Sequence, residues 1–105
     1  MRYKGQVRLG RKTKELVKNL KSRDIAVIDH PDLDAVGAMQ LADSGVSVVL
    51  NAADSITGRY PNLGPELLLE RGIVLIDRLG DAIFTQLQDG DQIQIVQQNN
   101  YLGGL

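Results

Sequence analysis

Residues that suit the binding of a phosphate-type anion are concentrated in one segment, residues 51–66. Ser55 and Thr57 offer hydroxyl donors, and Arg59 offers a planar cation with several N–H groups. Gly58 has no side chain, so backbone amides beside it can approach a ligand closely, and the helix expected after the segment would direct its amino end toward an anion. The predicted ligand-binding residues are Ser55, Thr57, Gly58, Arg59, Tyr60, Asn62 and Gly64.

The same segment also has a purely structural interpretation. Pro61 and Pro65 have no amide hydrogen to donate, Glu66 adds a negative charge, and the sequence contains no GxxxxGK[ST] phosphate-binding motif. In this interpretation three polar side chains only cap turns: Asn51, Ser55 and Asn62. The residues alone leave both interpretations open.

A second polar segment, residues 29–34, places three carboxylates and the only histidine of the chain within six positions. Mg²⁺ accepts one or two carboxylates together with water and substrate phosphates, so Asp29 and Asp34 are candidate ligands for Mg²⁺ beside a phosphate-containing ligand. The alternative is again structural. Asp32 would cap the following helix, Asp34 would complement the helix dipole, and His30 would bond to a neighbouring backbone group.

Length and composition exclude several classes of protein. The chain has 105 residues, 43% of them hydrophobic and 24% charged, which is typical of one globular domain and too short for a large multidomain enzyme. With no cysteine and one histidine, it has no disulfide, thiolate zinc site, cysteine nucleophile or multi-histidine metal centre. No GxSxG motif supports a hydrolase triad. Aromatic residues are scarce, which makes single-stranded nucleic acid a disfavoured partner.

The net charge of −1 conceals a strongly basic amino-terminal segment. Residues 1–23 contain nine basic side chains and one carboxylate, that of Glu15, whereas the rest of the chain has three arginines and twelve carboxylates. Such a segment can reach nucleic acid, an anionic membrane surface or an acidic partner, and binding of this kind weakens steeply with salt. It can equally fold as a solvated face against the acidic remainder of the chain.

Apolar runs alternate with amphipathic stretches, which predicts a single α/β domain with a mostly parallel sheet and functional groups at the carboxyl ends of its strands. Strands are predicted at residues 25–28, 46–50 and 73–76, with a half-exposed edge strand at 92–97. Helices are predicted at 11–21, 33–44, 65–72 and 82–87. Asp32 is the expected cap of the second helix, and Gly45 its expected end.

The predicted organisation is a basic arm and helix at residues 1–23, an α/β domain at 24–97 and a polar tail at 98–105. No apolar stretch approaches the ~20 residues that cross a bilayer, and no hydrophobic signal-peptide core follows the basic start. We therefore expect a cytoplasmic location. The glycine-bearing tail also fits a domain cut from a longer protein.

The segment 51–65, with Gly72–Ile73 and Asp77 behind it, fits the pattern NAAxSxxGRYPNxGP. In this it resembles the amino-terminal region of SteA-like bacterial proteins. The resemblance covers residues 5–97 and extends upstream through Thr13–Lys14, Asp24–Ala26 and Asp29–Asp34. In that family this region precedes a domain similar to thiamine pyrophosphokinase and a hydrophobic C-terminal segment, and members are associated with cell division and envelope separation.

The resemblance implies partners and a location for the full-length protein. The implied partners are the downstream domain of the same protein, a division or envelope protein, and a second copy of the chain. The implied location is the inner face of the membrane.

A more distant resemblance concerns the scaffold. The segments 24–28, 70–73, 80–82 and 89–91 resemble those of a swivelling phosphohistidine domain, which implies a β/β/α sandwich. In those enzymes a Thr-Ser-His or Thr-Cys-His triplet opens a helix, whereas Asn62-Leu63-Gly64 stands near that place here. Because Asn and Leu cannot form a phosphoramidate, the resemblance implies a shared scaffold without shared phosphotransfer.

Three function classes follow from these observations. The leading hypothesis is a noncatalytic module of a SteA-like cell-division protein that binds a small anionic ligand or a protein partner, with Arg59 anchoring the anion. The second is one part of a nucleotide-dependent, thiamine pyrophosphokinase-like kinase whose catalytic domain lies outside this chain. The third is an adaptor that binds nucleic acid or a membrane surface through residues 1–23.

Overall fold

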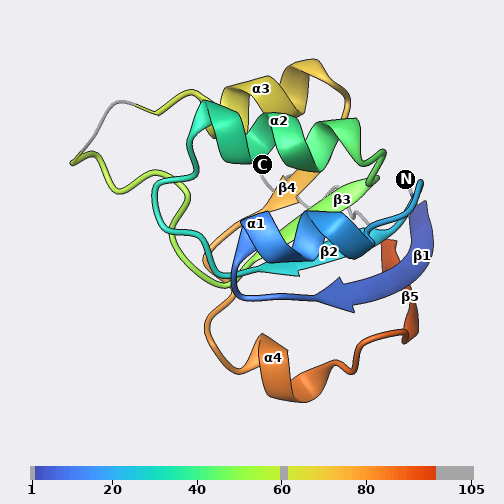
Figure 1. Cartoon of the computed structure of the whole chain (residues 1–105). Coiled ribbons are helices and arrows are strands. Elements are labelled where there is room, and N and C mark those ends of the chain that lie inside the picture. The colour runs from blue at the N-terminus through green and yellow to red at the C-terminus, as the bar shows by residue number, and fades with distance from the viewer. Residues whose placement is uncertain (1, 60–61, 97–105) are drawn as a thin grey trace, which may run out of the picture.

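A five-stranded sheet with the strand order β4-β3-β2-β1-β5 forms the centre of the computed structural model, which describes residues 2–59 and 62–96 (Figure 1). The strands are β1 (Arg2–Leu9), β2 (Ile25–Ile28), β3 (Val48–Asn51), β4 (Val74–Ile76) and β5 (Gln92–Val96). Strands β1 to β4 are parallel, and β5 is antiparallel to β1. The predicted single α/β domain with a mostly parallel sheet is confirmed.

The helices connect the strands and cover both faces of the sheet. They are α1 (Thr13–Leu16), the 3₁₀ helix η1 (Val17–Asn19), α2 (Ala35–Asp43), α3 (Gly64–Glu70) and α4 (Ile83–Gln86). Helices α1, α2 and α3 lie on one face and α4 on the other (Figure 1). Each step from β1 to β4 moves to the next neighbour in the same direction, so right-handed crossovers place the three connecting helices on one face.

The buried strands supply side chains to two separate cores. Strands β2 and β3 are buried at every position, as expected of apolar runs in a parallel sheet. Alternation along β2 sends Ala26 and Ile28 into the core beneath α2 and α3, and Ile25 and Val27 into the core on the α4 side. Along β5, exposure alternates between neighbouring positions, which agrees with the predicted edge strand.

Strand β1 is the element that sequence analysis missed, because its charges conceal its periodicity. Tyr3 and Val7 contribute to the core on the α4 side, while Arg2 and Lys4 are exposed. This alternation has the period of two that defines a strand with one buried face. The basic residues 1–23 therefore include an interior strand of the sheet, which lies between β2 and β5.

Strand β1 changes partners along its length. Residues 7–9 pair with β2, whereas residues 2–6 pair with β5. A Cβ atom added at Gly5 would lie 2.6 Å from the carbonyl oxygen of Arg23, so only glycine permits this close passage. The sheet curls as a result, and Tyr3 and Ile95 line a hollow of about 290 Å³ together with Val74 and Ile76 of the opposite edge.

The first helix is shorter than predicted. In place of one helix over residues 11–21, a single α-turn passes into η1, and Leu20 is already extended. A helix that ran to residue 21 would leave only three residues to reach the start of β2. The geometry of the short connection therefore overrides the helical periodicity.

The predicted cap of the second helix is wrong by two residues. Asp34, not Asp32, caps α2, with its Oδ1 accepting a hydrogen bond from the backbone N–H of Gly37 at 2.8 Å. Asp32 instead adopts a positive φ of 49° and turns the chain. The helix ends next to Gly45, whose φ of 82° confirms the predicted stop.

Among the described residues, no helix combines the length and the apolar character that a membrane crossing needs. The predicted tail at 98–105 and the end of the last strand at residue 97 lie outside the described part of the chain.

Substituting Gly64 with Ala should destabilise the protein by about 2 kcal/mol or more, because the new Cβ atom would overlap rigid backbone. An ideal Cβ at this position lies 2.2 Å from the carbonyl oxygen of Leu33. Urea denaturation monitored by circular dichroism measures the change. The matched control is Gly72→Ala, where φ is 75° but no atom lies within 4 Å, and the expected cost is only about 1 kcal/mol. Equal costs for the two variants would contradict the steric explanation.

Candidate functional site

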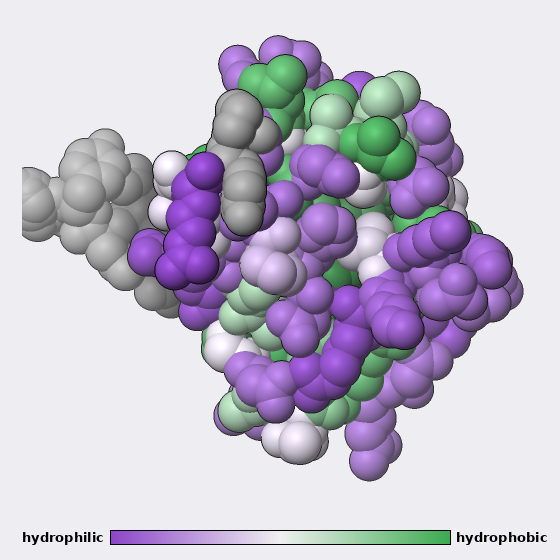
Figure 2. Space-filling model, turned by 60° about the vertical axis from the view of Figure 1, so that its left-hand side comes forward, coloured by the Kyte–Doolittle hydropathy of each residue, from purple (hydrophilic) through white to green (hydrophobic). Residues whose placement is uncertain are grey.

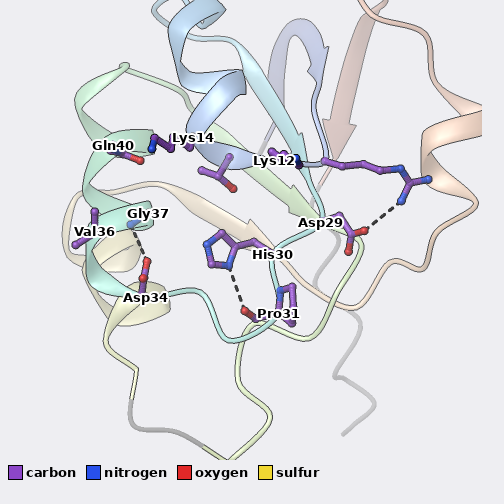
Figure 3. Close-up of a pocket in the computed structure, with 11 residues that line it drawn as sticks. Lys12, Lys14, Asp29, His30, Pro31, Asp34, Val36, Gly37 and Gln40 are labelled. Carbon is purple, nitrogen blue, oxygen red and sulfur yellow. Dashed lines mark hydrogen bonds and ion pairs between the residues drawn. The ribbon is translucent and has the colours of Figure 1, made fainter.

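A cavity of about 700 Å³ opens where β1 and β2 end, between the start of α1 and the side of α2 (Figure 3). The carboxyl ends of adjacent parallel strands meet at one edge of a sheet, which is where ligands bind in open α/β folds. Figure 2, turned toward that edge, shows a mainly hydrophilic surface. The cavity is lined by Arg11, Lys12, Thr13, Lys14, Asp29, His30, Pro31, Asp34, Val36, Gly37 and Gln40.

Thr13 is the most unusual residue of the cavity. It is only 4% exposed, yet its Oγ1 has no hydrogen-bond partner within the described part of the chain. A buried hydroxyl without a partner costs about 1–3 kcal/mol. The chain reaches this position through a tight turn at Gly10, where an added Cβ would lie 2.8 Å from the Cβ of Leu16. Thr13 therefore lines the cavity while its hydroxyl, an unsatisfied donor, lies beneath the surface of the wall.

Lys12 and Lys14 give this wall its positive charge. Both side chains are exposed, and neither has a carboxylate at ion-pair distance among the described residues. They flank Thr13 in the sequence and line the same cavity. The α1 wall thus combines two uncommitted ammonium groups with one uncommitted hydroxyl.

Arg11 differs from the two lysines because its charge is already neutralised. Its Nη1 lies 3.1 Å from Oδ2 of Asp29 and also bonds to Asp81, and its guanidinium carbon lies 4.3 Å from the ring centroid of Phe84. The hydrogen bond from Arg11, and then its positive charge, lower the pKa of Asp81 below its ordinary value. The same hydrogen bond raises the pKa of Arg11. Arg11 therefore attaches α4 to the cavity wall.

Two other basic residues of the amino-terminal segment, Arg8 and Lys18, also have carboxylate partners. Arg8 lies between Asp24, at 3.7 Å, and Asp89, at 3.2 Å, and Lys18 lies 3.4 Å from Glu15. Arg8 thus attaches the basic segment to the acidic remainder of the chain, whereas Lys18 pairs within the segment.

His30 lies at the base of the cavity with its ring held in place (Figure 3). Its Nδ1 is 3.1 Å from the carbonyl oxygen of Pro31, and its Nε2 lies next to the backbone of Gly37. A hydrogen on Nδ1 donated to that carbonyl leaves the lone pair on Nε2. A side chain at Gly37 would crowd His30, since an added Cβ would approach Nε2 to 3.3 Å.

The two carboxylates predicted to bind Mg²⁺ have other partners. Asp29 pairs with Arg11, and Asp34 caps α2. Within residues 2–59 and 62–96, no three Asp, Glu or His side chains come together as metal ligands would. Mg²⁺ binding by Asp29 and Asp34 stays a prediction from the sequence.

The loop from residue 52 to 63 is tied to the ends of three strands by a buried network. The Asn51 side chain accepts from the backbone N–H of His30 (3.0 Å) and of Ala53 (3.1 Å), and donates to the carbonyl of His30 (3.0 Å). It also donates to Oγ of Ser55 at 2.7 Å, and that hydroxyl donates to Asp77 at 2.7 Å. This amide thus fixes both the loop and the backbone of the cavity base.

A second set of hydrogen bonds closes the loop through Asp32. Its carboxylate accepts from the backbone N–H of Thr57 at 2.8 Å and from the Thr57 hydroxyl at 2.9 Å. Asn62 donates to the same carboxylate at 3.4 Å and to the carbonyl of Ser55 at 3.1 Å. The two hydroxyls predicted to bind an anion, those of Ser55 and Thr57, therefore donate to carboxylates.

The remaining predicted loop residues have separate environments. Gly58 adopts a φ of 85°, and Arg59 is exposed, with its backbone N–H donating to Oγ1 of Thr57 at 3.2 Å. Gly64 is buried against the backbone of Leu33. Tyr60 lies outside the described residues. The structure brings Ser55, Thr57 and Asn62 together, but it does not add Gly64 to them.

The cavity residues Lys12, Thr13 and Lys14 did not figure among the ligand-binding residues predicted from sequence. The signal that could have identified them is their position after a strand, and that strand was itself missed. No protein-family model matches this chain, and no curated protein matches it either.

Replacing Asn51 with Ala should lower the free energy of unfolding by about 3 kcal/mol, because the backbone of His30 and the backbone N–H of Ala53 lose the side-chain partner that Asn51 provides, and the Ser55 hydroxyl keeps only its bond to Asp77. Urea denaturation measures this loss. The control is Asn19→Ala, an exposed asparagine of η1, for which a change within about 0.5 kcal/mol is expected. A loss no larger than that of the control would show that the network contributes little.

Replacing Arg11 with Gln should return the pKa of Asp81 toward its ordinary value of 3.8, since hydrogen bond and charge are removed together. Because the pKa of Asp81 is lowered in the folded state, the contribution of the ion pair is present above the ordinary pKa and is lost as the pH falls through the folded pKa. Carboxyl ¹³C NMR titration follows this directly. Arg71→Gln, which removes a partner of Asp43 instead, should leave the titration of Asp81 unchanged.

Proposed function

We propose that this domain is a noncatalytic binding module whose cavity holds a small phosphate-type anion against Lys12, Thr13 and Lys14. The observation that carries the proposal is that Thr13, a residue lining the cavity, has a buried Oγ1 with no hydrogen-bond partner among the described residues. A phosphate oxygen accepts a hydrogen bond from a hydroxyl and is attracted by ammonium groups. One ligand would satisfy the donor and use both uncommitted charges.

The charge balance of the cavity supports an anion. Arg11 is shared between Asp29 and Asp81, and Asp34 is engaged at the start of α2. The cavity lining contains two carboxylates, those of Asp29 and Asp34, and neither lies at ion-pair distance from Lys12 or Lys14. The α1 wall remains positive as a whole.

This proposal moves the anion from the loop at residues 51–66 to the cavity. In the loop, an anion would have to displace the bonds that Ser55 and Thr57 make to Asp77 and Asp32, and it would meet the repulsion of both carboxylates. Arg59 is the remaining cation there. The cavity offers uncommitted donors without such a displacement.

The resemblance to SteA-like proteins supports a wider proposal, that the module acts in bacterial cell division beside a downstream domain. The pattern that carries the resemblance includes Asn51, Ser55 and Gly64, and each has a defined role in building the loop.

In a bacterium that carries the full-length protein, Lys14→Gln should then impair cell separation, scored by microscopy, and Lys4→Gln should not. The kinase alternative predicts turnover of ATP and thiamine only by the full-length protein.

Pyrophosphate should bind to this domain and shift the amide signals of residues 10–14 and 30 in two-dimensional NMR spectra. Lys14→Gln should weaken binding about 10-fold, the effect expected for losing a hydrogen bond to a charged group. Lys4→Gln, an exposed lysine of β1 that does not line the cavity, is the matched control and should bind as tightly as the unaltered protein.

Thr13→Val separates a ligand-binding role from a structural one. Replacing an unpartnered buried hydroxyl with a methyl group should leave the protein as stable or more stable, while pyrophosphate binding weakens. Loss of stability with unchanged binding would overturn the proposal. So would the absence of any spectral change at residues 10–14 with saturating pyrophosphate.

A further inference from the structure

We infer that the cavity takes a phosphate ester of a hydroxyl-bearing or amino-bearing organic group, with the phosphate on the α1 wall and the organic group on α2. This inference rests on the proposed phosphate site and adds the class of ligand. Its basis is the chemical difference between the residues that the start of α1 and those that α2 contribute to the cavity (Figure 3).

The size of the cavity exceeds what a bare phosphate needs. At about 700 Å³ it lies within the range of roughly 300–1,000 Å³ that organic ligands occupy in proteins. Lys12, Thr13 and Lys14 all come from the start of α1. A phosphate bound there leaves the opposite side unfilled.

The α2 wall has no cation. Its side chains come from Val36 and Gln40, which share one face of the helix because they are four positions apart, and Gly37 lies next to Val36. Val36 is 65% exposed, whereas Gly37 is buried, with its backbone N–H donating to Asp34. This wall therefore offers apolar surface and a polar amide, and it does not suit a second phosphate.

Hydrogen-bond acceptors complete the α2 wall. Oδ1 of Asp34 accepts from Gly37, and its second carboxylate oxygen has no partner among the described residues. The Gln40 side chain is exposed and likewise makes no hydrogen bond there. A carboxylate oxygen and an amide can bind hydroxyl or amino groups, and both sugars and nucleosides present these. The carboxylate would repel a further phosphate, which favours a monoester.

The experiment compares four probes by isothermal titration calorimetry: inorganic phosphate, ribose, ribose 5-phosphate and adenosine 5′-monophosphate. We expect at least one of the two esters to bind about 10-fold or more tightly than inorganic phosphate, and ribose to bind weakly or not at all. An advantage of the nucleotide over the sugar phosphate assigns contacts to the base, and equal affinities assign them to the sugar.

The variant Gln40→Ala tests where the organic group lies. It should remove most of the advantage of the ester, at least about 3-fold in affinity, and leave the affinity for inorganic phosphate unchanged. Gln86→Ala, an exposed helical glutamine of α4, is the matched control and should change neither. Because both glutamines are exposed, neither substitution should impair folding.

The failures are distinguishable. If inorganic phosphate binds and neither ester binds more tightly, the inference is overturned and the proposed function stands. Binding of ribose as tight as that of its phosphate overturns the inference as well, as does an equal effect of Gln40→Ala on ester and inorganic phosphate. If no phosphate-bearing probe binds, the proposed function fails together with the inference.

Discussion

The side-chain amide of Asn51 is the interaction on which the functional end of this molecule depends. It uses two donors and two acceptor bonds, and joins the end of β3 to the backbone of His30, to Ala53 and to Ser55. Buried polar groups stabilise a structure only when they are fully satisfied, and here each bond also fixes a different segment. Through this one residue the loop and the base of the cavity acquire a single geometry.

The arrangement of β2, β3 and α3 could be predicted because each has one dominant local signal. The apolar runs identify strands buried on both faces, and Pro65 near the start of α3 identifies a helix that begins there. Strand β1 has no such signal, since arginines and lysines occupy its outer face. Its role is set by pairing with β2 and β5, which are distant in sequence. The predicted boundaries of α1 are wrong for a similar reason, because the short connection to β2 determines where the helix ends.

For the candidate site, too, the residue types could be read from the sequence, whereas the contacts between residues far apart in the sequence could not. Sequence analysis identified the polar residues at 51–66 and 29–34, but it could not pair the Ser55 hydroxyl with Asp77, 22 positions away. That pairing decides whether a hydroxyl is free for a ligand. For Thr13 the difference between sequence and structure is reversed, because its hydroxyl was not predicted to bind a ligand. Nothing in a run of basic residues marks its hydroxyl, and only folding shows that it is buried without a partner.

The clamp formed by Arg11 links the two faces of the sheet. The guanidinium stacks on Phe84 and bonds to Asp81 next to α4, while it also neutralises Asp29 at the cavity. Because one guanidinium is shared by Asp81 and Asp29, the position of α4 and the electrostatic environment of Asp29 are coupled. This coupling connects α4, on one face of the sheet, to the cavity through the single side chain of Arg11, and it requires no rearrangement of the strands.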